Sequence, residues 1–315
     1  MADNGRMPDS TSAQLPKLDY FVVDVFTDAP LQGNPLAVVM NTCDLKTGQM
    51  QAIAREFNLS ETTFIERRSL EVERAEGVRV RIFTTQEELP FAGHPTLGTA
   101  SVLKANAPET VRDDTVTLAM NVGAVPVRFE QDGGGAALLG EMTQRDPDFG
   151  AELSPTEVAP LLGMAVDDLD QGLTPQVVST GNPFAIVVLR SVEALTRLKL
   201  DQEGATAWLR ERGARWFYVL APVLNQNQGA GQWRARMQFH GGEDPATGSA
   251  AGCAISYLVD RGAVPSDVRV HVQQGVEIGR PSDLFLTAKK ESARVTAVRV
   301  AGSTVPVAKG QLFQS

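Results

Sequence analysis

The sequence contains very little cysteine and histidine. Among 315 residues there are two cysteines, Cys43 and Cys253, and neither belongs to a Cys-x-x-Cys pair or a Cys/His cluster. Two cysteines cannot build the disulfide framework of a small secreted domain. Only three histidines are present, which is too few to suggest a zinc site, and we expect no metal.

Several signatures of common enzyme classes are also missing. The chain has no Gly-x-Ser-x-Gly elbow, no Gly-x-x-x-x-Gly-Lys-[Ser/Thr] loop and no Gly-x-Gly-x-x-Gly that opens a βαβ unit. These absences argue against an α/β-hydrolase, a P-loop enzyme and a Rossmann-type dinucleotide-binding enzyme.

Positive charge and long apolar runs are scarce. The 29 Lys and Arg residues stand against 38 Asp and Glu, a formal net charge of −9. Binding to a phosphate backbone needs clustered positive charge, so a general nucleic-acid binder is excluded. The longest apolar runs, such as Phe184–Leu189, are far shorter than the roughly 18 residues of a membrane helix. We expect neither nucleic acid nor a membrane as a partner.

The first residues of the chain are polar. Residues 1–16 contain Pro and Ser, and no apolar segment follows their basic residue. They predict a flexible leader rather than a secretion signal, and the cytoplasm is the expected location. With 43% hydrophobic and 21% charged residues, the rest has the composition of a globular protein, and its length suggests about two domains.

Two motifs occur twice, in the same order. Gly33-Asn34-Pro35 is echoed by Gly181-Asn182-Pro183, and Glu88-Leu89-Pro90-Phe91-Ala92-Gly93 by Glu243-Asp244-Pro245-Ala246-Thr247-Gly248. Between their prolines the motifs are 55 residues apart in the first half and 62 in the second. Gly-Asn-Pro and Glu-x-Pro are common in turns, and each match alone could be coincidence. Together they favour a duplicated domain.

Apolar patterning is consistent with a duplicated α+β fold. We predict two pseudo-symmetric domains, each a mixed or antiparallel sheet wrapped around a central helix. Residues 17–130 form the first domain, which the tail 303–315 is a candidate to join, and residues 131–302 form the second. The predicted strands are Tyr20–Phe26, Ala37–Met40, Thr62–Glu66, Val78–Phe83, Val177–Ser179, Ala185–Leu189, Trp216–Ala221 and Trp233–Phe239. The predicted helices are Lys46–Phe57, Pro155–Leu162 and Gly204–Arg212, with a hairpin over Arg128–Met142 and a crossover between the halves at Arg145–Phe149.

Each Glu-x-Pro motif runs into a stretch of small residues that predicts a closely packed central helix. Pro95 is suited to a first helical turn, and Thr247 and Ser249 are capping residue types. A helix start offers free backbone N–H groups and a partial positive charge, so it can bind a carboxylate. If an approximate two-fold axis relates the repeats, both helix starts face one ligand across the cleft. For one such loop, helix packing alone would explain the glycines.

Glu61 is a candidate acid-base residue. It follows the amphipathic helix directly, and Asn58 can end that helix in a left-handed conformation. Apolar neighbours such as Phe64 can desolvate the carboxyl group, which raises its pKa toward the range useful for proton transfer. Taken alone the evidence is weak, because most glutamates at such junctions are simply solvated.

His94 and Asp244 lie in the two helix-start loops. A histidine beside a helix N-terminus should have a lowered pKa and act as a neutral donor or proton relay. Asp244, near the second helix start, should be stabilised as a carboxylate. A buried structural histidine and a turn aspartate are the alternatives for these two residues.

With these residues the sequence resembles the PhzF family of phenazine-biosynthesis isomerases. The resemblance extends from about Leu18 to the C-terminus. It implies the fold of diaminopimelate epimerase, in which the active site lies between two pseudo-symmetric domains. It also implies a proton shift on a dihydro-hydroxyanthranilate, carried out by a glutamate without metal or organic cofactor, and a homodimer. The motifs that carry it are Gln32–Val38, Asn58–Phe64, Arg81–Thr84, Glu88–Pro95 and Glu243–Ala250.

By this resemblance the catalytic glutamate is Glu61, and His94 and Asp244 complete the proton-handling site. The residues assigned to binding of a small carboxylate substrate are Asn34, Gly93, Thr247, Gly248 and Ser249. Related epimerases and racemases carry one cysteine in each helix-start loop. Here neither loop contains cysteine, which argues against a two-thiol racemase.

Three hypotheses follow from the sequence. The first is a cofactor-independent isomerase acting on a small carboxylated cyclic substrate. The second is a non-catalytic member of the same fold that binds a small acid or a protein. The third is an epimerase whose bases are not thiols. Fold alone does not choose between them.

Overall fold

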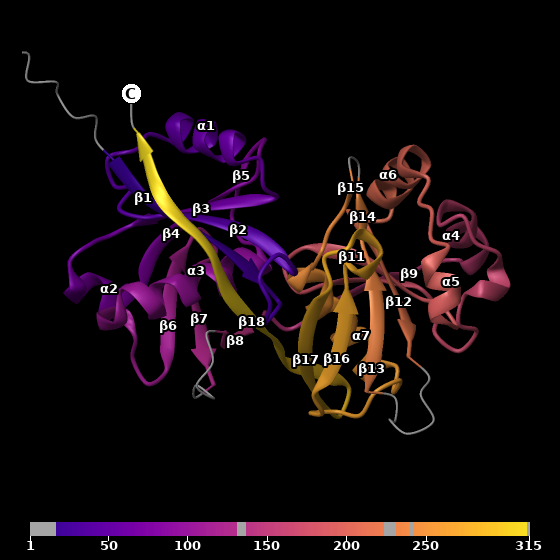
Figure 1. Ribbon diagram of the computed structural model, residues 1–315. Helices are drawn as coiled ribbons and strands as arrows, with labels where there is room; N and C mark the ends of the chain where they lie inside the picture. Colours follow the sequence, from indigo (N-terminus) through magenta and orange to yellow (C-terminus); the bar gives the residue numbers. More distant parts are fainter. Residues whose placement is uncertain (1–16, 131–136, 224–230, 240–241, 314–315) are drawn as a thin grey trace, which may run out of the picture.

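A computed structural model describes residues 17–130, 137–223, 231–239 and 242–313. The chain forms two halves that lie side by side (Figure 1). The elements of the first half are β1 (Lys17–Val25), β2 (Asn34–Val39), α1 (Thr47–Phe57), β3 (Glu61–Glu66), α2 (Leu70–Glu76), β4 (Val78–Phe83), β5 (Glu88–Leu89), α3 (Gly93–Asn106), β6 (Thr115–Met120), β7 (Gly123–Phe129) and β8 (Leu138–Thr143).

The second half begins with β9. Short 3-10 turns occur at Pro108–Thr110 in the first half and at Val166–Asp168 and Val276–Ile278 in the second. Its elements are β9 (Asp148–Glu152), α4 (Pro155–Leu161), β10 (Gln176–Ser179), β11 (Pro183–Val188), α5 (Val192–Thr196), α6 (Gln202–Glu211), β12 (Trp216–Pro222), β13 (Gln232–Arg236), β14 (Gln238–Phe239), β15 (Gly242–Glu243), α7 (Gly248–Asp260), β16 (Val270–Gln274), β17 (Ser282–Glu291) and β18 (Arg294–Phe313).

The two halves have the same strand topology. In the first half the order is β1-β2-β3-β4-β6-β7-β8, and in the second it is β10-β11-β12-β13-β16-β17-β18. Successive pairs are antiparallel, parallel, antiparallel, parallel, antiparallel and antiparallel in both halves. This identity of order and direction confirms the predicted pseudo-symmetric α+β fold.

Two segments cross between the halves. Strand β18 pairs first with β17, then with β8 around Gly140 and Gly302, and finally with β1 from Thr304 to Phe313. Figure 1 shows it in yellow, running across both halves. In the opposite direction the chain leaves β8 and enters β9, which pairs with β10. The halves therefore exchange strands and share one continuous sheet.

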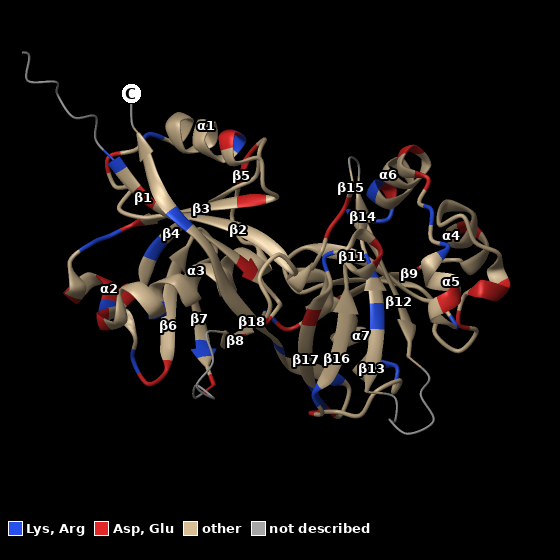
Figure 2. Ribbon diagram, in the orientation of Figure 1, with Lys and Arg blue, Asp and Glu red and all other residues tan. Residues whose placement is uncertain are grey.

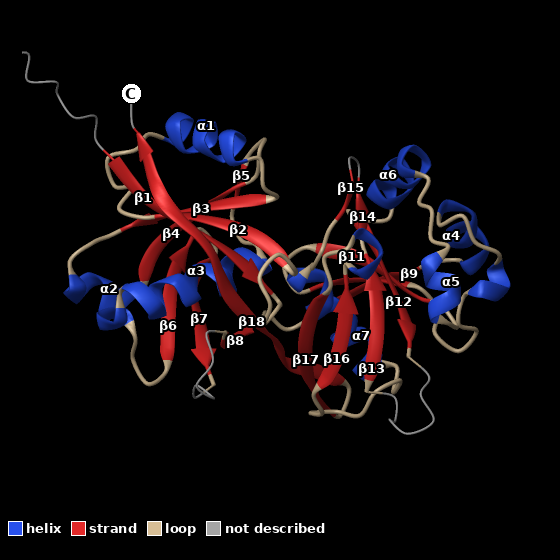
Figure 3. Cartoon of the chain, viewed as in Figure 1, coloured by secondary structure: helices blue, strands red, loops and turns tan. Residues whose placement is uncertain are grey.

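A central helix lies in each half, as predicted. Helices α3 and α7 are buried along most of their length and lie among the strands (Figure 3). Small residues make this possible: a Cβ on Gly98 would lie 2.6 Å from Cδ2 of Leu36, and one on Gly252 would lie 1.9 Å from Oε1 of Gln144. The glycines let each sheet close tightly around its helix. Helices α4, α5 and α6 cover the outer side of the second half.

Most predicted elements occur, with two differences. The predicted strand Trp233–Phe239 is two strands, because β14 leaves the main sheet and pairs with β15. The predicted helix Gly204–Arg212 begins earlier, at Gln202, because the Asp201 carboxylate accepts a hydrogen bond from Gly204 N (3.1 Å) and caps the helix. The leader 1–16 and the predicted Gly-rich turn at 133–135 lie outside the described residues.

The predicted hairpin over Arg128–Met142 is formed by β7 and β8, in which Arg128 pairs with Glu141. It bridges the domain division that the sequence placed at 130/131. Because β8 extends the sheet of the first half, we propose that this half continues through Thr143 and that residues 144–147 cross to the second half. Residues 304–313 lie on β1, in the first half.

Candidate active site

The starts of α3 and α7 meet between the two halves. A Cβ on Gly93 would lie 3.0 Å from the backbone N of Ser249 and 3.1 Å from Cα of Gly248. Each helix start leaves backbone N–H groups without a partner inside the helix and carries partial positive charge. The structure therefore places the two helix starts against each other, as the repeated motifs predict.

Glu61 and His94 face each other beside these helix starts. Glu61 is the first residue of β3, and the left-handed Asn58 (φ 51°) ends the preceding helix, as expected. Glu61 Oε2 lies 3.4 Å from His94 Nε2. Neither atom makes a hydrogen bond with the described residues, although both are buried. Buried polar atoms normally have partners, so these two atoms have unused hydrogen-bonding capacity.

The two groups have strongly shifted pKa values. Burial, and then the nearby carboxylate of Asp244, raise the pKa of Glu61 from 4.5 to about 8. Burial lowers the pKa of His94 from 6.5 to about 3. The direction for His94 is the one expected from sequence, but its cause is burial and not the helix start. At neutral pH Glu61 is therefore mostly a carboxylic acid and His94 a neutral imidazole.

Asp244 is held from both halves. Asn34 Nδ2 donates to its Oδ1 over 2.8 Å, and Thr247 Oγ1 donates to its Oδ2 over 2.7 Å. Burial raises the pKa of Asp244 to about 6, while the bonds from Thr247 and Asn34 and a backbone bond from Ala246 lower it. Asp244 is still mostly ionised at pH 7, but the expectation that the helix start stabilises its carboxylate is wrong in direction, because burial raises its pKa. Asn34 also donates to the carbonyl of Ala246 over 2.9 Å, and its own Oδ1 is buried without a partner among the described residues.

The remaining predicted residues lie at the start of α7. Gly248 is the first residue of the helix and Thr247 is its N-cap. The expectation that Thr247 caps the helix with its side chain is wrong, because its hydroxyl donates to Asp244 instead. Ser249 is half-buried in the first turn, beside Gly93. The structure thus brings all eight predicted residues into one region between the halves.

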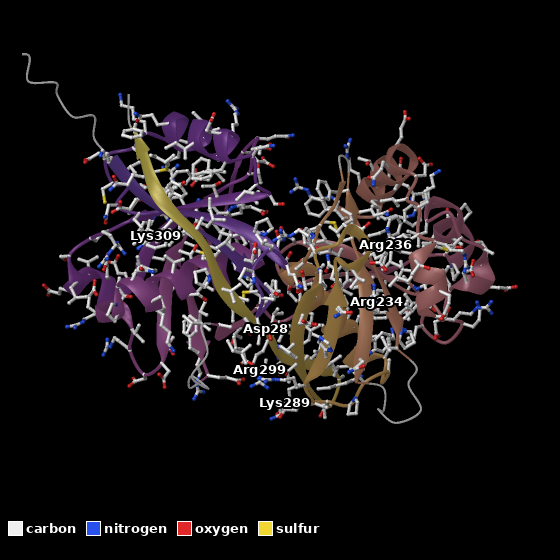
Figure 4. The ribbon with its side chains drawn as sticks, in the orientation of Figure 1. Asp28, Arg234, Arg236, Lys289, Arg299 and Lys309 are labelled. Atoms are coloured by element: carbon white, nitrogen blue, oxygen red, sulfur yellow. The ribbon has the colours of Figure 1, made fainter. Side chains whose placement is uncertain are left out.

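An arginine–glutamate pair supports each helix-start loop. Arg81 donates twice to Glu88, over 2.8 and 2.6 Å, and Arg236 donates twice to Glu243, over 2.8 and 2.7 Å. Arg236 lies on β13, as does the neighbouring Arg234 (Figure 4). The Nη1 group of Arg236 also donates to the carbonyl of Leu195 in α5, over 3.1 Å. The glutamate of each repeated motif is therefore structural.

Two residues at the site were not found from the sequence. The side chain of Gln274 contacts both Asp244 and Thr247, and Tyr218 donates to it. A glutamine and a tyrosine within strands have no local motif. The only sequence signal was the glycine that follows, Gly275, which has a left-handed φ of 76°.

The internal symmetry shows that the site is present once. Leu36 pairs with Glu61 in the first half, and Phe184 pairs with Trp216 in the second, so Trp216 occupies the position of Glu61. By the repeated motifs, Ser249 corresponds to His94 and Leu89 to Asp244. The second half therefore has no equivalent of the Glu61–His94 pair.

The cysteines lie away from the helix-start loops. Cys253 is buried inside α7, where its sulfur lies 3.5 Å from Oγ1 of Thr180, and burial raises its pKa to about 11. Cys43 is exposed in the loop that precedes α1. Neither thiol is placed to act as a base in the site, as the sequence predicts.

Figure 2 shows Lys and Arg interspersed with Asp and Glu over both halves. No helix in the described part of the chain has the length and apolar composition needed to cross a bilayer. Within the same ranges, no three His, Cys, Asp or Glu side chains are grouped as metal ligands.

Comparison with known proteins identifies the family. The family model for phenazine biosynthesis-like proteins, PhzC-PhzF, matches residues 23–310. The chain belongs to the PhzF family. It is 37% identical to the trans-2,3-dihydro-3-hydroxyanthranilate isomerase of Pseudomonas aeruginosa over 93% of this chain and 99% of that protein. The isomerase of the same name from Pseudomonas chlororaphis is 35% identical, over 93% and 98% of the two chains.

Solved structures agree with this membership. The PhzF-family protein of Bacillus anthracis superposes with a TM-score of 0.82 and 25% identity, over 95% of this chain and all of that one. A hydroxyproline epimerase of Agrobacterium vitis shares the fold, with a TM-score of 0.59, 10% identity and coverage of 94% and 92%. This member of the PhzF family is thus an isomerase with an epimerase-like fold.

Proposed function

We propose that this protein isomerises a small carboxylated cyclic substrate, such as a dihydro-hydroxyanthranilate, by a proton shift in which Glu61 is the acid-base residue. The observation that carries the proposal is the Glu61–His94 pair. Its facing atoms are 3.4 Å apart and unpartnered among the described residues, beside two helix starts. The 37% identity to a named hydroxyanthranilate isomerase supports the substrate class.

The helix starts bind the substrate carboxylate in this proposal. Backbone N–H groups at Gly93 and Gly248, together with the Ser249 hydroxyl, supply donors, and the helix dipoles favour negative charge. The Asp244 carboxylate and the Oδ1 of Asn34, which has no partner among the described residues, accept hydrogen bonds from the substrate's polar groups. A net charge of −9 does not oppose this, because nearby dipoles dominate the potential inside a buried site.

The proton shift needs one group that first accepts and then returns a proton. The ionised form of Glu61 takes a proton from a ring carbon, and the electrons of the broken C–H bond shift the double bond along the ring. Glu61 then delivers the proton to the carbon at the other end of the system, so atoms and charge balance. His94 Nε2 can exchange a hydrogen bond with Glu61 in either protonation state.

A single acid-base residue has a stereochemical consequence. The position equivalent to Glu61 in the other half holds Trp216, which cannot accept a proton. In this proposal Glu61 both removes and returns the proton, so both steps occur on one face of the ring. The third hypothesis needs a second base on the other face, and Trp216 cannot be that base.

The test is hydrogen exchange with trans-2,3-dihydro-3-hydroxyanthranilate as the probe in heavy water. We expect the wild type to isomerise the probe, and Glu61→Gln to lose isomerisation and deuterium incorporation by about 100-fold or more. The matched control is Glu66→Gln at the far end of β3, where Glu66 Oε2 lies 3.7 Å from Arg79 Nε. Equal exchange rates in Glu61→Gln and wild type would disprove the role of Glu61.

The binding-only hypothesis is tested by the same probe. A probe that raises the melting temperature but is recovered unchanged from the wild-type protein would favour binding without catalysis. Conversion of the probe excludes that hypothesis.

We further propose a homodimer in the cytoplasm. Family resemblance supports the dimer, and two unpaired cysteines agree with a reducing compartment. Light scattering should give twice the mass of one chain, and a mass of one chain across micromolar concentrations would contradict the dimer.

A further inference from the structure

We infer that Gln274 and Arg280 are positioning residues, the two ends of a clamp that sets the Asn34–Asp244 hydrogen bond between the halves. This inference rests on the proposed function, since it concerns the same site. The clamp is the segment 274–280, between the end of β16 and the start of β17.

The first end of the clamp is the side-chain amide of Gln274, which is fully buried. Its Oε1 accepts from the backbone N of Thr247 (3.1 Å) and from the Tyr218 hydroxyl (3.0 Å). Its Nε2 donates to the carbonyl of Asp244 (2.8 Å) and to Oγ1 of Thr247 (3.0 Å). All the hydrogen-bonding groups of the amide are used, so it has one orientation.

That orientation directs the hydroxyl of Thr247. Because Gln274 Nε2 donates to Oγ1 of Thr247, the hydroxyl hydrogen is free to point to Oδ2 of Asp244, 2.7 Å away. A directed chain of donors therefore runs from Tyr218 through Gln274 and Thr247 to Asp244. It keeps Asp244 as an acceptor.

The other half of the molecule lacks this device. Arg79 and Arg234 occupy equivalent positions before the repeated Glu-x-Pro motifs. Arg79 pairs with Ala119 and Arg234 pairs with Gln273. The residues that follow these partners, Met120 and Gln274, are therefore equivalent. A thioether cannot donate a hydrogen bond. The equivalent of Asp244 is Leu89, which needs no donor. The amide thus occurs only in the half whose loop carries a carboxylate, which a purely structural role does not explain.

The second end of the clamp is Arg280, which holds the loop before Asn34. Its guanidinium contacts Asp24 Oδ1 (2.6 Å), the Gly33 carbonyl (2.8 Å) and the Gln32 carbonyl (2.6 Å). The Asp24 side chain is only 3% exposed. Arg280 therefore ties the loop of the first half to the segment of the second half.

A tight turn joins the two ends. Gly275 has a φ of 76°, and a Cβ there would lie 2.3 Å from the Arg280 carbonyl oxygen and 2.6 Å from that of Pro245. Arg280 N donates to the Gly275 carbonyl over 3.0 Å. The turn therefore ties the two ends of the clamp together. Gln274 is hydrogen-bonded to Asp244, and Arg280 is hydrogen-bonded to the loop before Asn34. Together they position the two residues that form the 2.8 Å hydrogen bond.

The decisive variant is Gln274→Met, which places the residue of the equivalent position in the other half. We expect kcat to fall about 10- to 100-fold with a smaller change in KM, because misplacing a catalytic group is costly. The control is Gln273→Met, on the same strand, whose amide reaches only Asp283 (3.4 Å) in the described structure. A kcat equal to that of wild type, or an equal loss in both variants, would overturn the inference.

A second measurement does not depend on activity. We expect Gln274→Met to raise the pKa of Asp244 above its wild-type value of about 6, because the bond from Thr247 lowers it. Carboxyl NMR titration with labelled aspartate measures this, with Asp244→Asn for assignment. Glu61 and Tyr218 also lie close enough to Asp244 to interact with its charge, and their variants show whether their titration contributes. An unchanged Asp244 pKa overturns the clamp. If the wild type does not convert the probe, only the proposed function fails.

The arginine end is tested with Arg280→Lys and Asp24→Asn, singly and together. We expect each to lower kcat and the double variant to lose less than the sum of the two single losses, since both variants weaken the same Arg280–Asp24 contact. Arg299→Lys is the control, because Arg299 pairs with Asp267 on the surface over 3.0 Å. Additive losses in the double variant, or wild-type kcat in both single variants, would overturn this end of the clamp.

Discussion

Glu61 Oε2 and His94 Nε2 lie 3.4 Å apart, and neither atom has a hydrogen-bond partner among the described residues. Glu61 belongs to a strand and His94 to the first turn of the central helix. Their opposite pKa shifts leave both neutral at pH 7 in the free protein. Two neutral groups that can exchange a proton thus lie beside the two helix starts.

The rate should depend on ionisation of Glu61. Since its pKa is raised to about 8, the carboxylate that accepts the substrate proton becomes dominant only above that pH. We expect kcat/KM for the hydroxyanthranilate probe to rise with pH and level off above about 8. A rate that is constant from pH 5 to 9 would show that ionisation of Glu61 does not limit the reaction.

The raised pKa of Glu61 also makes the stability of the folded protein depend on pH. Between pH 4.5 and 8 the folded state holds the Glu61 proton more tightly than the unfolded state, so the stabilisation is complete below pH 4.5 and is lost as pH rises to about 8. Glu61→Gln removes this dependence. We expect the free energy of unfolding of the variant, relative to that of the wild type, to increase over this pH range by a few kcal/mol at most, on the order of the pKa shift. Urea unfolding of both proteins at the two pH values measures this change. A difference in free energy of unfolding that is the same at both pH values would contradict the prediction.

His94 should remain neutral in mild acid. Its pKa is lowered to about 3 by burial, so its ring nitrogens should show no protonation between pH 5 and 8. Nitrogen NMR of labelled histidine, assigned with His94→Asn, tests this. We expect that variant to lose about 100-fold in kcat, as for loss of a proton relay. Protonation of His94 with a midpoint near 6.5 would contradict the prediction.

Gly93 should not tolerate a side chain. A Cβ there would meet the backbone of Ser249 and Gly248 at 3.0 and 3.1 Å, and backbone cannot move aside easily. We expect Gly93→Ala to cost about 1–3 kcal/mol of stability and most of the activity, because it separates the helix starts. Gly48→Ala in α1 is the control, since nothing lies within 4 Å of its Cβ. Equal activity in both variants would show that close approach of the helix starts is unnecessary.

The two arginine–glutamate pairs should differ in energetic weight. The Arg236 and Glu243 side chains are 8% and 6% exposed, whereas those of Arg81 and Glu88 are 15% and 23% exposed. We expect Glu243→Gln to cost about 3–5 kcal/mol, because the buried Arg236 charge keeps only the more distant carboxylate of Glu277, at 4.0 Å. Glu88→Gln should cost less, about 1 kcal/mol. Equal costs in chemical unfolding would contradict the difference in burial.

Much of the site could be predicted from sequence because its signals are local. Gly-Asn-Pro and Glu-x-Pro turns fix backbone direction within a few residues, and small residues mark a helix that must pack closely. Repetition of both motifs predicted the two facing helix starts around Gly93 and Gly248. The family motifs then indicated Glu61, His94 and Asp244, which the structure places together.

Other features could not be predicted, because they depend on contacts between distant residues. The Asn34–Asp244 bond joins positions 210 residues apart. Nothing local distinguishes Gln274 from any other buried glutamine, or Arg280 from a surface arginine. The split of the predicted strand Trp233–Phe239 likewise depends on β15, which draws β14 out of the main sheet.

Local sequence thus predicted the duplicated α+β fold and the two helix starts, since turns and helix starts are governed by short-range sterics, and the family motifs indicated the chemical groups of the site. The protonation states and the single, asymmetric site were decided by tertiary structure. Burial shifts the pKa values of Glu61 and His94, and strand register places Trp216 at the position of the second half that is equivalent to Glu61. Desolvation and register arise only when distant segments pack together, so no local pattern encodes them.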